Sequence, residues 1–168
     1  MTKNIAKYGL LTALAIILGY VEFLIPVNLG IPGTKLGIAN IAVIFSLYLL
    51  GRNGAFLISM VRIIISGLLF GGVFSMLYSL GGGILSFAVM ALLYKNRHLS
   101  SVGVSIAGGA CHNIGQLVVA VLVANTPTLF SLFPWLVLVG AVTGAVNGVL
   151  TLIILRRTKG IDFFRNIC

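Results

Sequence analysis

The stretch GGACHNIGQ, residues 108–116, places three hydrogen-bonding side chains inside an otherwise apolar run. His112 and Gln116 are four positions apart, so on a helix they share one face, and Asn113 lies at the flank of that face. Imidazole and amide groups in an apolar segment can hydrogen-bond a polar molecule. The sequence contains no C-x-x-C-H motif for haem attachment, so hydrogen bonding is the first role expected of His112.

Further polar residues interrupt other apolar runs, namely Glu22, Asn40 and Arg62. Charged and amide groups are costly in a membrane and normally face the interior of a helix bundle or a wet cavity. Ser59 and Ser66 lie three positions before and four positions after Arg62, on the same helical face. We therefore expect these side chains to converge with those of residues 108–116 inside a bundle.

The segment NLGIPGTKLGIAN, residues 28–40, adds a Pro-Gly turn followed by Thr34 and Lys35. Free backbone amides at a helix N-terminus beside a lysine attract phosphate or carboxylate. The two positive charges of Lys35 and Arg62 are opposed there by only one carboxylate, that of Glu22. This excess of positive charge favours a small anionic or strongly polar ligand. The predicted ligand-binding residues are Thr34, Lys35, Asn40, Arg62, His112, Asn113, Gln116 and Glu22.

The same polar residues have a purely structural interpretation. Glu22 could form an ion pair with Arg62, and the amides could hydrogen-bond across helices, as polar groups do in membrane bundles. A mixed arrangement is also open, in which Glu22 orients an arginine that contacts ligand.

Composition identifies the class of protein that carries these residues. The chain has 168 residues, of which 60% are hydrophobic and 8% are charged, and its formal net charge is +9. This profile is that of an integral membrane protein. The basic residues lie at the ends of apolar runs, where they set orientation and meet anionic lipid, so a nucleic-acid partner is not expected.

A helix needs about 20 mostly apolar residues to cross the hydrocarbon layer. The apolar runs predict six spans in a single membrane domain comprising residues 1–168, at 8–27, 36–51, 54–70, 73–94, 102–124 and 132–155. With both termini cytoplasmic, the outer loops contain only Lys35. The basic residues expected on the cytoplasmic side are Lys3, Lys7, Arg52, Lys95, Arg97, Arg156, Arg157, Lys159 and Arg165.

The predicted fold is all-α, a polytopic six-helix bundle in the bacterial plasma membrane. The runs lack the two-residue alternation of a barrel strand, so helices must satisfy the backbone hydrogen bonds. Gly140, Gly144 and Gly148 form a ridge at intervals of four that permits close helix contact. This ridge favours packing within the bundle over docking of a separate membrane protein.

The absence of several motifs limits the chemistry of this sequence. It has no G-x-x-x-x-G-K-[ST] motif for nucleotide hydrolysis. Its one aspartate, Asp162, lies near the C-terminus, whereas prenyl-chain synthesis requires clustered aspartates that hold magnesium on a diphosphate. Cys111 and Cys168 match no metal or disulfide spacing. We therefore expect neither catalysis, nor cofactor, nor bound metal from this chain alone.

At PGTKLGIANI (32–41) and GGACHNIGQLVVA (108–120) the sequence resembles the Gx transporter family, also described as heptaprenyl diphosphate synthase component I. The resemblance covers nearly the whole length. That family is similar in size and topology to the S-components of energy-coupling factor (ECF) vitamin transporters. An S-component captures a vitamin or precursor from outside and docks on a shared transmembrane subunit driven by two ATPases.

The resemblance implies a docking surface of small residues on the first helix, here Ala13, Ala15 and Gly19. The function expected first is a membrane-embedded subunit for uptake of a small anionic or polar vitamin, cofactor, or isoprenoid or quinone precursor. One alternative is a non-catalytic membrane component of heptaprenyl diphosphate synthesis. Another is a standalone proton-driven carrier, with Glu22 or His112 as the relay.

Overall fold

The computed structural model describes residues 2–25, 37–96 and 98–158, and within these ranges the chain forms helices and no strands. The expected all-α class is therefore confirmed. The elements are α1 (Thr2–Leu24), α2 (Asn40–Ser66), the π-helix η1 (Gly67–Gly71), α3 (Gly72–Leu93), α4 (Ser101–Ala124), the 3-10 helix η2 (Pro127–Leu132) and α5 (Phe133–Thr158).

Four helical stretches in the described part are long and apolar enough to cross a membrane: Ile5–Leu24, Asn40–Leu93, Ser101–Ala124 and Pro127–Thr158. This count differs from the six spans expected. The expected spans 36–51, 54–70 and 73–94 follow one another without a loop in a helical stretch of 54 residues. Only two non-helical glycines divide them, Gly51 (φ 77°, ψ −173°) and Gly72 (φ 72°, ψ 169°). Glycine permits this conformation because it lacks a Cβ atom.

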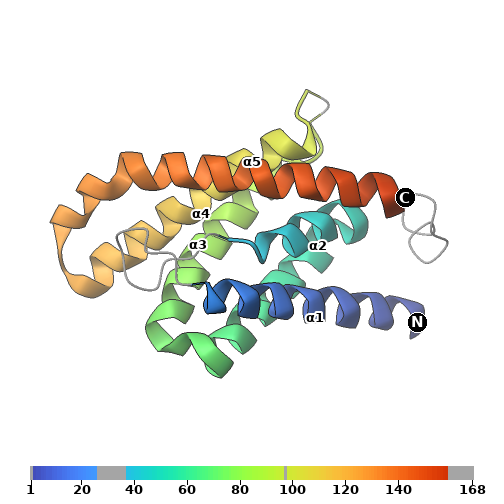
Figure 1. Cartoon of the computed structure of the whole chain (residues 1–168), viewed down its shortest axis with the longest axis horizontal. Helices are drawn as coiled ribbons and strands as arrows, with labels where there is room; N and C mark the ends of the chain where they lie inside the picture. Colours follow the sequence, from blue (N-terminus) through green and yellow to red (C-terminus); the bar gives the residue numbers. More distant parts are fainter. Residues whose placement is uncertain (1, 26–36, 97, 159–168) are drawn as a thin grey trace.

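The helices form two groups, α3–α4–α5 and α1–α2, which meet where α2 contacts α3 and α5. α4 packs along both α3 and α5, and α1 packs on α2, which also contacts α3 and α5. In Figure 1, α1 and α5 run lengthwise in opposite directions, so α1 begins at the end of the molecule where α5 ends.

Glycines allow α4 to approach both of its neighbours closely. A Cβ atom placed on Gly115 would lie 2.5 Å from the carbonyl oxygen of Gly81 in α3, and one on Gly140 would lie 2.5 Å from that of Gly109 in α4. Gly144 and Gly148 likewise lie against the backbone of α4. The ridge on α5 therefore packs within the chain, as the sequence favoured, and we call the α3–α4–α5 contacts the glycine seam.

The distribution of polarity is that of a protein surrounded by lipid. Large apolar side chains cover the outside, including Leu68, Leu92 and Leu122, each more than 70% exposed. Serines, amides and charged groups are buried between the helices. A soluble protein would expose far smaller apolar patches, so this surface is suited to a bilayer.

Candidate polar site

Arg62 is the centre of a buried polar junction. Its guanidinium Nη2 donates to the side-chain Oδ1 of Asn40 over 2.7 Å, and both residues are 7% exposed. Glu22 of α1 is 5% exposed and attracts Arg62 electrostatically. The sequence predicted all three as site residues, and the fold brings them together from α1 and both ends of α2.

Gly37 connects this junction to α5. Its backbone N–H donates to the Glu22 carboxylate, and its carbonyl oxygen accepts a 2.9 Å hydrogen bond from the Nδ2 of Asn147. The positive φ of Gly37, 84°, favours glycine at this position. Residues from α1, α2, α5 and the segment before α2 thus meet at one place, which we call the Arg62 junction.

Sequence reasoning missed Asn147. It lies directly before Gly148 in a helix that was interpreted only through its glycines. Its side chain is 6% exposed, and the signal that could have identified it was an amide among the glycines of an otherwise apolar span.

Two polar atoms at the Arg62 junction have no hydrogen-bond partner in the described part of the chain. They are Nε of Arg62 and the hydroxyl of Ser66, which lies one helical turn away. Burying such groups without partners costs free energy, more so for a charged group. The junction therefore retains hydrogen-bonding capacity for a further molecule.

The polar residues of α4 are used differently. Asn113 donates from Nδ2 to the backbone oxygen of Leu136 over 2.8 Å, which fastens α4 to α5. His112 and Gln116 lie against α3, since a Cβ atom on Gly82 would fall 2.7 Å from the His112 carbonyl oxygen and 2.8 Å from Cγ of Gln116. Both amide atoms of Gln116 lack a hydrogen-bond partner within the described ranges.

The hydrogen bond of Asn113 is made to α5 and not to the Arg62 junction. Asn113 acts as the interhelical latch that was the alternative interpretation of these residues, and it has no hydrogen bond to Asn40 or Arg62 in the described part. The physical reason is helix rotation: three neighbouring polar positions on α4 span enough of its circumference to face α3 and α5 separately. Thr34 and Lys35 lie outside the described residues.

The small residues predicted for docking on α1 also differ in their surroundings. Ala15 is fully buried, in an apolar cluster with α2 residues. A Cβ atom on Gly19 would lie 3.4 Å from the Ser66 hydroxyl. Ala13 is exposed, as is Gly9, which has no neighbouring atom within 4 Å of a placed Cβ. The accessible small face of α1 is thus formed by Gly9 and Ala13.

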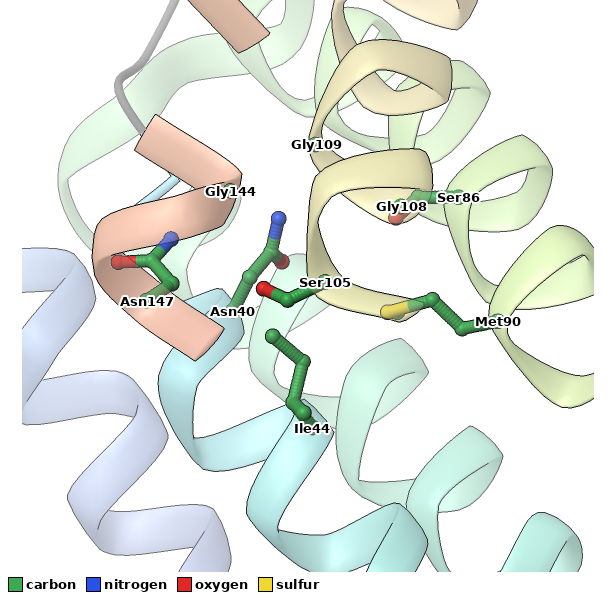
Figure 2. A pocket seen from close by; sticks show the side chains of 9 residues that line it. All are labelled: Asn40, Ile44, Ser86, Met90, Ser105, Gly108, Gly109, Gly144 and Asn147. Atoms are coloured by element: carbon green, nitrogen blue, oxygen red, sulfur yellow. The ribbon is translucent and has the colours of Figure 1, made fainter. Parts of the chain in front are cut away.

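A small hollow of about 10 Å³, enough for about one water molecule, adjoins the Arg62 junction. Figure 2 shows the side chains of Asn40, Asn147, Ser105 and Ile44 around it, with Ser86 and Met90 on α3 completing the wall. The remaining lining residues are Gly108, Gly109 and Gly144. Among the predicted site residues that the structure describes, Asn40 alone lines this hollow.

The serines of α3 were also not among the site residues predicted from the sequence. Ser75, Ser79 and Ser86 are all buried, and their spacing of four and seven places them on one helical face. Within the described residues, no three His, Cys, Asp or Glu side chains gather where they could hold a metal ion.

Comparison with known proteins places this architecture in a family. The family model for heptaprenyl diphosphate synthase component I matches residues 11–154, which include all five α-helices at least in part. No curated protein and no solved structure matches the chain. The chain belongs to the heptaprenyl diphosphate synthase component I family.

Proposed function

We propose that this chain is a membrane-embedded binding subunit for uptake of a small anionic or polar molecule, of the vitamin or of the isoprenoid and quinone precursor class. The observation that supports this most directly is the buried guanidinium of Arg62, whose Nε has no partner in the described part of the chain. A buried cation with unused donors suits a carboxylate or phosphate group.

The charges of the Arg62 junction favour a ligand of this kind. Glu22, which interacts electrostatically with Arg62, also accepts a hydrogen bond from the backbone N–H of Gly37. Arg62 keeps a donor for a second anion, and the hydroxyl of Ser66 can contribute another hydrogen bond. Intramembrane ionisable groups mark ligand pathways more often than plain packing contacts.

The proposed topology is six passages with both termini cytoplasmic. It is supported by the breaks at Gly51 and Gly72, and by the position of the start of α1 and the end of α5 at the same end of the molecule (Figure 1). Residues 40–50 rise about 16 Å, roughly half of the hydrocarbon thickness. We propose that this half-length helix begins near the bilayer centre, so that its first residue, Asn40, meets Arg62 at the depth where a ligand from outside would be held.

As in S-components, the proposed partner is a transmembrane subunit coupled to two ATPases. The exposed small face of Gly9 and Ala13 on α1 is available for close contact with such a helix.

Binding of isopentenyl diphosphate to the purified chain tests this function. We expect saturable binding, and affinity at least tenfold lower in Arg62→Gln, because removal of a charged hydrogen-bonding partner costs about 1.5–3 kcal/mol. Asn113→Ala is the matched control, because it removes a buried hydrogen bond away from Arg62. Equal affinity in the wild type and Arg62→Gln would remove the proposed site.

A second candidate, favoured by the family match, is a non-catalytic membrane component of heptaprenyl diphosphate synthesis. In this role the Arg62 junction holds the diphosphate of a lipid substrate for a soluble catalytic partner. Native mass spectrometry of the freshly extracted protein separates the two candidates. Co-purified ATPases support uptake, whereas a co-purified aspartate-rich synthase supports the second role.

A further inference from the structure

The hollow beside the Arg62 junction has a lining that differs from the junction in charge. The nine lining residues that the structure describes are uncharged, and their polar groups are the amides of Asn40 and Asn147 and the hydroxyls of Ser86 and Ser105. Asn40 also accepts a hydrogen bond from Arg62 through its Oδ1, and Arg62 in turn interacts with the charge of Glu22. Asn40 therefore connects the charged junction with the hollow.

The two hydroxyls in this lining have no hydrogen-bond partner within the described ranges. Ser86 is 2% exposed and Ser105 is 1% exposed, so neither reaches bulk water or lipid headgroups. They come from different helices, α3 and α4, and face the same space. Ser46 provides a contrast: it is 0% exposed, and its hydroxyl donates to the Ala42 backbone oxygen over 2.6 Å.

Unpaired hydroxyls around a space indicate an occupant that hydrogen-bonds. Buried water needs two to four polar partners, and genuinely empty cavities are apolar. The hollow offers four polar side chains that together supply both donors and acceptors. A charged group would instead lose its hydration without gaining a counter-charge from this lining.

We propose that the hollow is a binding site for a small neutral hydrogen-bonding group, such as a hydroxyl, carbonyl or amide, and that water fills it when no such group is bound. The site adjoins the proposed anion-binding junction through Asn40. A molecule held at both places would carry an anionic end at Arg62 and a neutral polar group in the hollow.

Water-to-protein magnetisation transfer in solid-state NMR tests the resting state of the full chain in liposomes. We expect the Cβ signals of Ser86 and Ser105 to receive magnetisation from water several times faster than that of Ser46, the buried serine with a bonded hydroxyl. Transfer to Ser86 and Ser105 as slow as to Ser46 would show that no water occupies the hollow and would overturn the proposal.

Cysteine labelling tests the preference for neutral groups. Ser105→Cys, and in a second variant Ser86→Cys, are made in a Cys111→Ser, Cys168→Ser background. The control is Ala120→Cys, on the same helix as Ser105 and 2% exposed in an apolar cluster. The probes are methyl methanethiosulfonate, which is small and neutral, and its anionic sulfonatoethyl analogue.

We expect the neutral probe to modify the thiols of Ser105→Cys and Ser86→Cys at least tenfold faster than the thiol of Ala120→Cys, as measured by intact mass. The anionic probe should modify none of the three appreciably. Labelling of both serine variants as slow as that of the control, or equal rates with both probes, would overturn the proposal. Arg62 is unchanged in every variant, so this test fails or succeeds separately from the proposed function.

Discussion

The glycine seam and the Arg62 junction join helices by opposite means. In the glycine seam, α3, α4 and α5 approach until backbone meets backbone, as at Gly81 with Gly115 and at Gly109 with Gly140. At the Arg62 junction, α1, α2 and α5 are connected through side-chain hydrogen bonds and a charge pair. Backbone atoms in direct contact leave no room for a ligand between them, whereas hydrogen bonds and a charge pair can exchange partners.

This difference suggests that the two regions have different roles in the bundle. Close backbone packing supplies dispersion contacts without polar groups, which suits a rigid scaffold in lipid, where no hydrophobic force drives helices together. The Arg62 junction costs stability, because a charge pair removed from water is often no better than an apolar contact of the same size. We infer that the backbone contacts of the glycine seam form the scaffold, and that the Arg62 junction and the hollow beside it form the proposed binding region.

The largest expected effect comes from breaking the charge pair. Arg62→Leu removes a cation that interacts with the buried carboxylate of Glu22, and we expect stability to fall by about 3 kcal/mol or more. Unfolding of the purified protein in mixed micelles at increasing dodecyl sulfate fraction measures this loss. The double variant Glu22→Gln, Arg62→Gln should recover part of the stability, and a loss below about 1 kcal/mol in Arg62→Leu would contradict a paired junction.

Added side-chain volume in the glycine seam should lower the stability of the protein. Gly115→Val places a Cβ atom 2.5 Å from the Gly81 oxygen and 2.8 Å from the Gly82 Cα, and we expect a loss of about 2 kcal/mol from overpacking. The same unfolding assay applies. Gly9→Val is the control, because no atom lies within 4 Å of its Cβ, so a similar loss in both variants would show that the seam is not tightly packed.

The smallest effects distinguish the two regions most sharply. Asn113→Ala and Asn147→Ala each remove one hydrogen bond to a backbone oxygen, and we expect each to cost about 0.6 kcal/mol of stability. Only Asn147→Ala should weaken isopentenyl diphosphate binding, by about threefold if a similar free energy is lost at the site. Equal affinities of the two variants in a binding titration would remove this distinction.

Much of the architecture could be predicted from the sequence. Apolar run length predicted helices, and the interval of four between Gly140, Gly144 and Gly148 predicted close packing within the bundle. The described residues form four long helical stretches, in place of the six separate spans expected. Run length does not reveal that Gly51 and Gly72 can redirect the chain with single non-helical residues in place of loops.

The site was predicted only in part. The cost of burying charge correctly indicated that Glu22 and Arg62 face inward, and both are buried. Helix rotation and register are not fixed by a polar pattern alone, so Asn113 could not be separated from the Arg62 group in advance. Ser86 and Ser105 were overlooked because serine is common in apolar helices, and only their shared hollow distinguishes them.

Hydrogen–deuterium exchange with and without saturating isopentenyl diphosphate tests most directly whether the Arg62 junction is the binding region. We expect slower amide exchange in residues 37–47 and in the turns of α2 around Arg62, with no change in the residues of α4 that face α3. Saturable binding that slows exchange only along α4, and leaves residues 37–47 unchanged, would contradict this account.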